Sequence, residues 1–295
     1  MTRAVFIGEC MVELSMRPDG TYARAFAGDA YNAAVHFKHC APVIEVQFAT
    51  VTGDDELSGV MRAAWRGEGI DDALAPAAAG LQPGLYLVDV GADGERRFAY
   101  WRGQSAARLW LSAVERYADR LAAADLLFLT GTSLAILPET DRARALALLD
   151  RPRLTAFDPN VRPSLWQSQK LMRETIEAAL ARADIVLPSL DDAEVLWGPA
   201  SAEDHARHCL DLGAREVALT LGADGCLLAS ADVPVLRIAA EPATVVDTAG
   251  AGDAFDGAYL AARLQGENPE AAARSGLALA ARVIGQRGAL PTVKS

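Results

Sequence analysis

The sequence predicts an α/β fold built on a mostly parallel β-sheet. Continuous apolar runs of the kind found in strands buried on both faces recur along the 295 residues. Segments with the 3.6-residue spacing of helices lie between most of these runs. One segment alternates apolar and polar residues instead, which indicates a small antiparallel unit beside the main sheet. Because ligands bind beyond the carboxyl ends of parallel strands, functional residues are expected directly after the strands.

The elements follow one another in a regular order. The first strands are expected within residues 4–9 (AVFIGE) and 43–51 (VIEVQFATV), where aromatic and β-branched residues gather. Further strands are expected within 125–131, 154–160, 184–189 and 216–222. Helices are expected within 139–149, 171–183 and 201–213, where apolar residues recur three and four positions apart.

Residues 84–102 (GLYLVDVGADGERRFAYWR) break the alternation of strands and helices. They predict a hairpin of two strands around a turn that contains glycine and aspartate. Such a hairpin is open to three interpretations: a lid over the site, an edge for pairing with a second subunit, or a surface appendage. No Pro-, Gly- or Ser-rich linker divides the chain, so a single domain over 1–295 is expected.

Composition limits the kinds of partner. The formal net charge is −11, and 51% of the residues are hydrophobic. An acidic chain of this kind is not expected to bind nucleic acid or an anionic membrane, so any anionic ligand must be held by a few arginines or by backbone amides. The four scattered cysteines, the absence of a signal-peptide pattern and the lack of a long uninterrupted apolar window predict a protein of the cytoplasm.

The stretch DTAGAGDAFDGAYLAARL, residues 247–264, places small residues before an apolar helix. Gly250, Ala251 and Gly252 leave the backbone unshielded, so amides at the helix start can point at an anion. The stretch is not a dinucleotide fingerprint, because Phe255 occupies the third glycine position. It is not a Walker A loop either, because no Gly-Lys-Ser/Thr follows.

Asp253 sits inside this stretch, although a carboxylate repels a bound phosphate. One interpretation is a general base that takes a proton from a substrate hydroxyl as its oxygen attacks a phosphate. The other is an acid that complements the dipole at a helix N-terminus. The residues by themselves leave both interpretations open.

The segment DTAGAGDAFDGAYLA resembles the C-terminal signature of the PfkB (ribokinase-like) family of carbohydrate kinases. AGDAYNAAV at 27–35 and TVTGDDELSG at 50–59 resemble its N-terminal signature. The resemblance implies a ribokinase-like three-layer sandwich with a small antiparallel β lid, formed roughly by residues 11–27 and 80–104. It also implies ATP and Mg²⁺ as cofactors, Asp253 as the catalytic base, and an anion hole that follows Gly250 and is formed by the amides of Ala251, Gly252 and Asp253.

On the nucleotide side the resemblance implies that Thr220, Gly222 and Gly225 approach ATP, together with Asn160 and Arg162. The family's Asn-x-x-Glu motif is replaced by Ser189 and Asp192 in PSLDDAEVLWG. The carboxylate is kept in a shorter form, so Asp192 is expected to have a Mg²⁺-related role. Ser189 keeps the position of the motif but has lost its amide. Thr248 lies where some relatives bind a monovalent cation.

The acceptor is inferred from side chains that follow the strands and the hairpin. Arg162 and Arg102 are both expected at one cleft, and two guanidinium groups suggest a carboxylate on the substrate. FDPNVRPSLW, YWRGQSAA and IGECMVEL resemble the branch of the family that phosphorylates 2-keto-3-deoxygluconate. In that branch the sugar acid is surrounded by residues that match Gly28, Asn32, Tyr86, Tyr100, Arg102, Arg162 and Asp253. The family's Gly-Gly is Ala27-Gly28 here, and the added methyl is expected to narrow the pocket.

The expected activity is therefore transfer of the γ-phosphoryl group of ATP to the 6-hydroxyl of 2-keto-3-deoxygluconate. One alternative is a kinase of the same family that acts on fructose, ribose or a nucleoside. An alternative of another class is a non-catalytic sensor that binds a sugar acid. The free edges of the lid predict a homo-oligomer formed through it.

Overall fold

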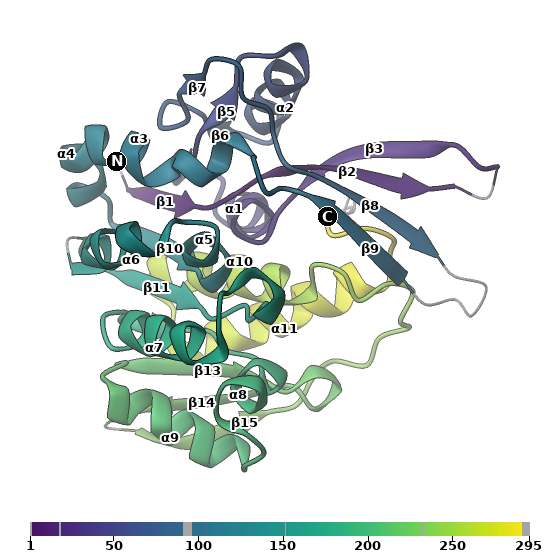
Figure 1. The fold of residues 1–295 in the computed structure, drawn as a ribbon. Coiled ribbons are helices and arrows are strands. Elements are labelled where there is room, and N and C mark those ends of the chain that lie inside the picture. Colours follow the sequence, from purple (N-terminus) through teal and green to yellow (C-terminus); the bar gives the residue numbers. More distant parts are fainter. Residues whose placement is uncertain (1, 18, 91–95, 151, 232, 291–295) are drawn as a thin grey trace.

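The computed structural model describes residues 2–290 except 18, 91–95, 151 and 232. Its central sheet has the strand order β15-β14-β13-β12-β11-β10-β1-β4-β6 (Figure 1). The strands are β1 (Arg3–Ile7), β4 (Glu45–Ala49), β6 (Ile70–Asp71), β10 (Leu126–Thr130), β11 (Thr155–Asp158), β12 (Ile185–Val186), β13 (Glu216–Thr220), β14 (Cys226–Ser230) and β15 (Val233–Ile238). Neighbours from β6 to β13 are parallel, and only the last two pairs are antiparallel. The predicted mostly parallel sheet is confirmed.

Helices cover both faces of this sheet. They are α1 (Asp29–Cys40), α2 (Glu56–Gly67), α3 (Trp110–Val114), α4 (Ala118–Ala122), α5 (Gly131–Ala135), α6 (Glu139–Leu146), α7 (Gln169–Leu180), α8 (Leu190–Trp197), α9 (Ala202–Leu212), α10 (Ala251–Leu264) and α11 (Pro269–Ile284). Side chains alternate between two cores, so that Val5 and Ile7 of β1 pack toward α3, α5, α7 and α9, whereas Phe6 packs toward α1, α10 and α11. Two helical layers and one sheet form the predicted three-layer sandwich.

A second sheet projects from one edge of the sandwich (Figure 1). It has the order β3-β2-β8-β9, with β2 (Met11–Met16), β3 (Tyr22–Ala27), β8 (Leu85–Val90) and β9 (Arg96–Trp101). The predicted hairpin is confirmed as the antiparallel pair β8–β9, while its turn lies outside the described residues. The expectation of an antiparallel lid is wrong at its centre, because β2 and β8 are parallel. Parallel pairing arises because each hairpin enters the lid from the sandwich in the same direction.

The two remaining strands, β5 (Thr52–Gly53) and β7 (Ala77–Ala78), form a short parallel pair outside both sheets. Within the part of the chain that the structure describes, no helix is both long enough and apolar enough to cross a membrane.

Helices α1 and α10 pack very closely, and this contact positions the site. A Cβ built on Gly257 would lie 2.6 Å from the backbone oxygen of Ala33 and 2.8 Å from the backbone nitrogen of Phe37. Only glycine permits this approach, since the neighbouring atoms are backbone atoms that cannot move aside. The N-termini of both helices therefore meet beyond the carboxyl ends of the strands.

Candidate active site

A cavity of about 810 Å³ lies where the carboxyl ends of the strands face the lid. Its walls come from the segments after β1, β10, β11, β12 and β13, from the starts of α1 and α10, and from β8 and β9. The predicted acceptor-side residues all line it: Gly28, Asn32, Tyr86, Tyr100, Arg102, Arg162 and Asp253. The cavity thus lies beyond the carboxyl ends of the strands, where parallel sheets bind their ligands.

The glycine-rich stretch forms the start of α10. Gly250 has φ 74°, and a Cβ there would lie 2.7 Å from the Cα of Ala289. The amide of Ala251 donates to the carbonyl of Thr248 at 3.3 Å, whereas amides in the first turn of a helix have no intrahelical acceptor. The predicted anion cradle would therefore depend on the amides of Gly252 and Asp253 more than on that of Ala251. Their dipoles favour a negative group at this end of the cavity.

The two glycines of this stretch are expected to respond differently to alanine. Gly250→Ala should lower thermal stability, by about 1–3 kcal/mol, because the left-handed backbone and Ala289 both reject a side chain. Gly252→Ala should leave the melting temperature unchanged, since no heavy atom lies within 4 Å of the added carbon. It should instead raise the KM for the phosphate donor several-fold, because the added methyl weakens the contact between this amide and the phosphate. A weakened hydrogen bond of this kind costs roughly 1 kcal/mol. Melting curves and steady-state kinetics of both variants check this, and an unstable Gly252→Ala would contradict it.

Asp253 occupies the third position of α10 and faces α1. Asn32 donates a hydrogen bond from Nδ2 to its Oδ2 at 2.7 Å. Burial and the negative charge of Asp29 raise the pKa of Asp253 to about 7, while the Asn32 hydrogen bond and the charge of Arg162 act in the opposite direction. A carboxylate with a pKa near neutrality is suited to accept a proton from a hydroxyl and release it afterwards.

This raised pKa predicts the pH dependence of turnover. If Asp253 is the base that the sequence predicts, it is active when deprotonated, so kcat/KM should rise with pH through a limb centred near 7, with protonation below that value removing activity. Asp29→Asn removes a negative charge and should move the limb to lower pH. Asp211→Asn, which alters an exposed acid on α9, is the matched control and should leave it in place. A limb that stays fixed in Asp29→Asn would contradict the role of that charge.

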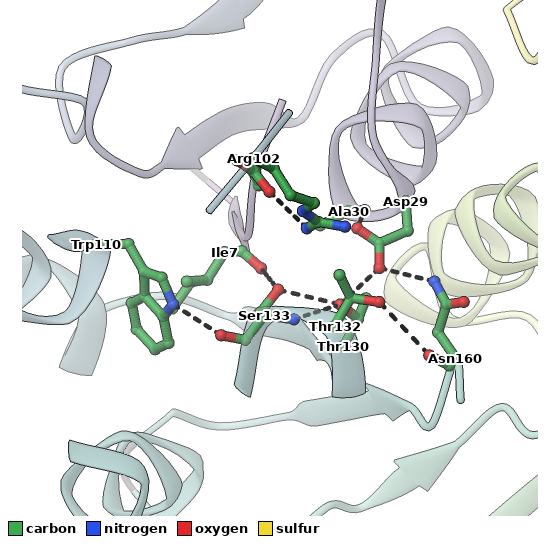
Figure 2. Close-up of polar contacts among 10 residues, drawn as sticks. Ile7, Asp29, Ala30, Arg102, Trp110, Thr130, Thr132, Ser133 and Asn160 are labelled. Carbon is green, nitrogen blue, oxygen red and sulfur yellow. Dashed lines mark hydrogen bonds and ion pairs between the residues drawn. The ribbon is translucent and has the colours of Figure 1, made fainter. Parts of the chain in front are cut away.

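Asp29, which sequence reasoning did not single out, organises the polar wall beside the base. Its Oδ2 accepts hydrogen bonds from Thr130 Oγ1 at 2.8 Å and from Asn160 Nδ2 at 2.7 Å (Figure 2). Asn160 has φ 32°, a left-handed backbone conformation that asparagine tolerates better than most residues. The predicted Asn160 is therefore brought to the cavity, with its side-chain amide engaged by Asp29. The sequence signal was available, since Asp29 stands between Gly28 and a helical run.

Asp158, Asp192 and Asp256 are among the further acids that line the cavity. Asp158 accepts from the Asn160 amide at 2.9 Å, and Asp192 accepts from the Val161 amide at 2.9 Å. Burial and neighbouring negative charges raise the pKa of Asp158 and of Asp256, and burial raises that of Asp192. Asp158 and Asp256 were missed because a residue at the end of a strand and a residue inside a helix give no motif of their own.

These carboxylates suit a hard cation such as Mg²⁺, which prefers oxygen ligands. Among residues 2–290, with the gaps noted above, no group of three or more His, Cys, Asp or Glu side chains is arranged to hold a metal ion by itself. Mg²⁺ commonly binds one or two carboxylates together with waters and substrate phosphates. The donor set therefore fits a cation that arrives with a phosphate ligand.

The predicted nucleotide-side residues divide into two groups. Ser189 and Thr220 line the cavity, as do Asn160, Arg162 and Thr248. Ser189 also caps α8, because its Oγ accepts from the Asp192 amide at 3.0 Å, so its position has a structural reason. Gly222 and Gly225 are not among the residues that line the cavity. Gly225 instead has φ 99° and would bring a Cβ to 2.0 Å from the Ile238 oxygen, which makes it a requirement of the turn.

The lid supplies an aromatic wall. The rings of Tyr86 and Tyr100 stack with centroids 5.6 Å apart, and Phe98 stacks on Tyr100 at 6.2 Å. The hydroxyl of Tyr86 donates to Glu13. Ala27 packs with Met11 and Tyr86 inside the lid and does not line the cavity, so the expectation that its methyl narrows the pocket is wrong.

Both predicted arginines reach the cavity, in different electrostatic settings. Arg162 donates to the adjacent carbonyl of Val161 at 2.8 Å, and its charge opposes the raised pKa of Asp192. Arg102 forms an ion pair with Glu9, with Nη2 and Oε2 2.5 Å apart. Glu9 was not foreseen, although it is the last residue of the segment predicted to hold the first strand.

Comparisons with known proteins agree with this geometry. Residues 1–294 match the model of the pfkB family carbohydrate kinases. The 2-dehydro-3-deoxygluconokinase of Escherichia coli (strain K12) is 39% identical over 297 residues, which cover 96% of this chain and 95% of that protein. The crystal structure of a PfkB protein from Polaromonas sp. JS666 superposes with a TM-score of 0.86 at 27% identity, covering 97% and 96% of the two chains. A putative ribokinase II from E. coli, solved in complex with ATP and Mg²⁺, superposes with a TM-score of 0.85 at 21% identity, covering 98% and 94%.

Proposed function

Because this chain belongs to the PfkB family of carbohydrate kinases, we propose that it transfers the γ-phosphoryl group of ATP to the 6-hydroxyl of 2-keto-3-deoxygluconate. The observation that carries the proposal is the position of Asp253, which lies beside an amide cradle and in the same cavity as the lid arginine Arg102. The 39% identity to a 2-dehydro-3-deoxygluconokinase over nearly the full length supports the choice of acceptor.

The proposed chemistry is an in-line transfer. Asp253 takes the proton of the 6-hydroxyl as that oxygen forms a bond to the γ-phosphorus, and the bond from phosphorus to the β–γ bridging oxygen breaks to release ADP. The amides of Gly252 and Asp253 stabilise the negative charge on the equatorial oxygens. Asn32 fixes the carboxylate through its 2.7 Å hydrogen bond, so that one oxygen faces the acceptor. The proton then passes from Asp253 to water.

ATP and Mg²⁺ are the proposed cofactors, in keeping with the ligands named for the E. coli ribokinase II structure. Thr220, Ser189 and Arg162 would lie along the nucleotide side of the cavity, and Asp192 with Asp158 would hold Mg²⁺ through oxygen ligands. When bound, the cation would neutralise charge on the phosphates in a cavity rich in carboxylates. A monovalent cation near Thr248 and a nucleotide contact by Gly222 or Gly225 stay predictions.

The acceptor is proposed to lie between α1 and the lid. Arg102 and Arg162 would receive its carboxylate, and Tyr86 and Tyr100 would cover its carbon chain. Gly28 and Asn32 lie at the start of α1, where Asn32 would accept from or donate to sugar hydroxyls. A neutral sugar would offer no negative charge to either guanidinium group, which favours a sugar acid over fructose or ribose.

An ADP-release assay over a panel of acceptors tests the function. The panel contains 2-keto-3-deoxygluconate, its neutral analogue 3-deoxyfructose, fructose, ribose and adenosine. The highest kcat/KM is expected for the sugar acid, and ³¹P–¹H correlation of the product should place the phosphate on C6. A preference for fructose, ribose or adenosine would assign the chain to another member of the family. Binding of the sugar acid without any ADP release would favour the sensor.

The assembly and the compartment are also proposals. Met16, Tyr22 and Trp101 are exposed and, by strand register, project from the lid face opposite Tyr86 and Tyr100. An apolar outer face with β3 and β9 as free edges supports pairing between two lids. The four cysteines are all unpaired, as expected in the reducing cytoplasm.

A further inference from the structure

The ion pair between Glu9 and Arg102 joins the main sheet to the base of the lid. Glu9 follows β1 at the centre of the sandwich, and Arg102 directly follows β9. Their side chains are 1% and 11% exposed, and Oε2 of Glu9 lies 2.5 Å from Nη2 of Arg102. Two charged groups are rarely buried in this way unless each is the partner of the other.

The surroundings pack closely around Glu9. A Cβ on Gly84 would lie 2.7 Å from Oε1 of Glu9 and 3.2 Å from the Cβ of Arg102, so a glycine makes room for the pair. Gly28 similarly allows close approach, because a Cβ there would lie 2.0 Å from the Glu9 carbonyl oxygen. Burial raises the pKa of Glu9, while the positive charge of Arg102 opposes this. The carboxylate is thus buried against Arg102 and next to Gly84.

Glu9 also lines the cavity, but its side chain is only 1% exposed and both of its carboxylate oxygens are buried. Arg102 retains some exposure and lines the cavity. We infer that Glu9 is a positioning residue, which holds Arg102 in the conformation that receives the substrate carboxylate and so helps the site select an acid. This inference rests on the proposed sugar-acid substrate.

The physical reason is the conformational freedom of arginine. A free arginine side chain samples many rotamers, and fixing it when a ligand binds reduces affinity by about 0.5–1.5 kcal/mol. Glu9 holds Nη2 of the guanidinium before the substrate arrives, and a guanidinium carries further N–H groups that can donate to a carboxylate. Glu9 also places a negative charge behind Arg102, which acts against binding an anion. Since Arg102 largely neutralises that charge in the ion pair, positioning is expected to be the larger effect.

Kinetics of Glu9→Gln test the inference. The KM for 2-keto-3-deoxygluconate should rise about three- to tenfold, the factor that corresponds to ordering one long side chain. The kcat and the KM for ATP should stay within about twofold, because Asp253 and the amide cradle are untouched. Glu45→Gln is the matched control, as Glu45 pairs with Arg3 at the opposite end of β1 and β4. It should leave the sugar-acid KM unchanged.

A double-mutant cycle separates positioning from a structural role. In an Arg102→Ala background, Glu9→Gln should add nothing to the sugar-acid KM, whereas two independent effects would multiply. Glu9→Asp is made in parallel, because it keeps the negative charge and can replace Glu9→Gln if that variant fails to fold. If both variants fold, Glu9→Asp should raise the KM for the sugar acid less than Glu9→Gln does.

An unchanged or lower KM in Glu9→Gln, or full multiplication in the cycle, overturns the inference. If the unmodified protein instead fails to phosphorylate the sugar acid, it is the proposed function that fails.

Discussion

Asp253→Asn is expected to reduce kcat by about three orders of magnitude, within the 10²- to 10⁴-fold range of general-base catalysis. The substitution keeps the shape of the side chain, and its amide oxygen can still accept the hydrogen bond from Asn32. What is lost is the group that takes the hydroxyl proton. Affinity for ATP should persist or increase, because a carboxylate no longer faces the phosphates. Single-turnover kinetics and calorimetric titration with ATP measure the two effects separately.

Asp191→Asn is the control for this prediction. Asp191 also lines the cavity but is exposed at the start of α8 and precedes Asp192. Its loss alters the net charge near the site by the same amount, and turnover should change by no more than about threefold. If Asp253→Asn kept a tenth of the normal kcat, another group would have to be the base.

Arg102→Ala is expected to raise the KM for 2-keto-3-deoxygluconate by about 10- to 100-fold, as for loss of a hydrogen-bonded charge worth 1.5–3 kcal/mol. The KM for ATP should stay within about twofold. For 3-deoxyfructose, which carries a hydroxymethyl group in place of the carboxylate, the change should be small. Equal effects on the acid and on its neutral analogue would argue against a carboxylate contact.

Stability must be measured beside these constants. Arg102→Ala leaves the Glu9 carboxylate buried without its counter-charge, which costs about 3–5 kcal/mol in comparable cases. Arg102→Lys restores a positive charge next to Glu9 but cannot offer two parallel N–H groups to a carboxylate. It should therefore fold normally and still show a raised KM for the sugar acid.

The fold was largely predictable because buried parallel strands leave a strong pattern. The apolar run from Ala4 to Ile7 and those at 125–131 and 216–222 all became strands of the main sheet. The parallel pairing of β2 and β8 could not be foreseen, since it depends on two hairpins that are far apart in sequence. Alternation identifies a strand and its faces but says nothing about its neighbour.

The site was predictable where glycines or charges stood out. Gly250, Gly252 and Asp253 form a recognisable run, and Arg102 and Arg162 follow apolar segments. Glu9 and Asp256 were missed for a physical reason: an isolated acid in an apolar stretch is usually at the surface, and only the tertiary structure places its partner beside it.

The close contact at Gly257 also bears on how new acceptors can be engineered. It fixes α1 against α10 by backbone contacts, and through Asn32 it fixes Asp253, whereas Tyr86, Phe98 and Tyr100 come from a separate sheet. A combinatorial library confined to these three aromatic positions would explore different sugars while the transfer machinery stays intact. Selection from such a library would alter what the enzyme accepts and leave its way of moving phosphate unchanged.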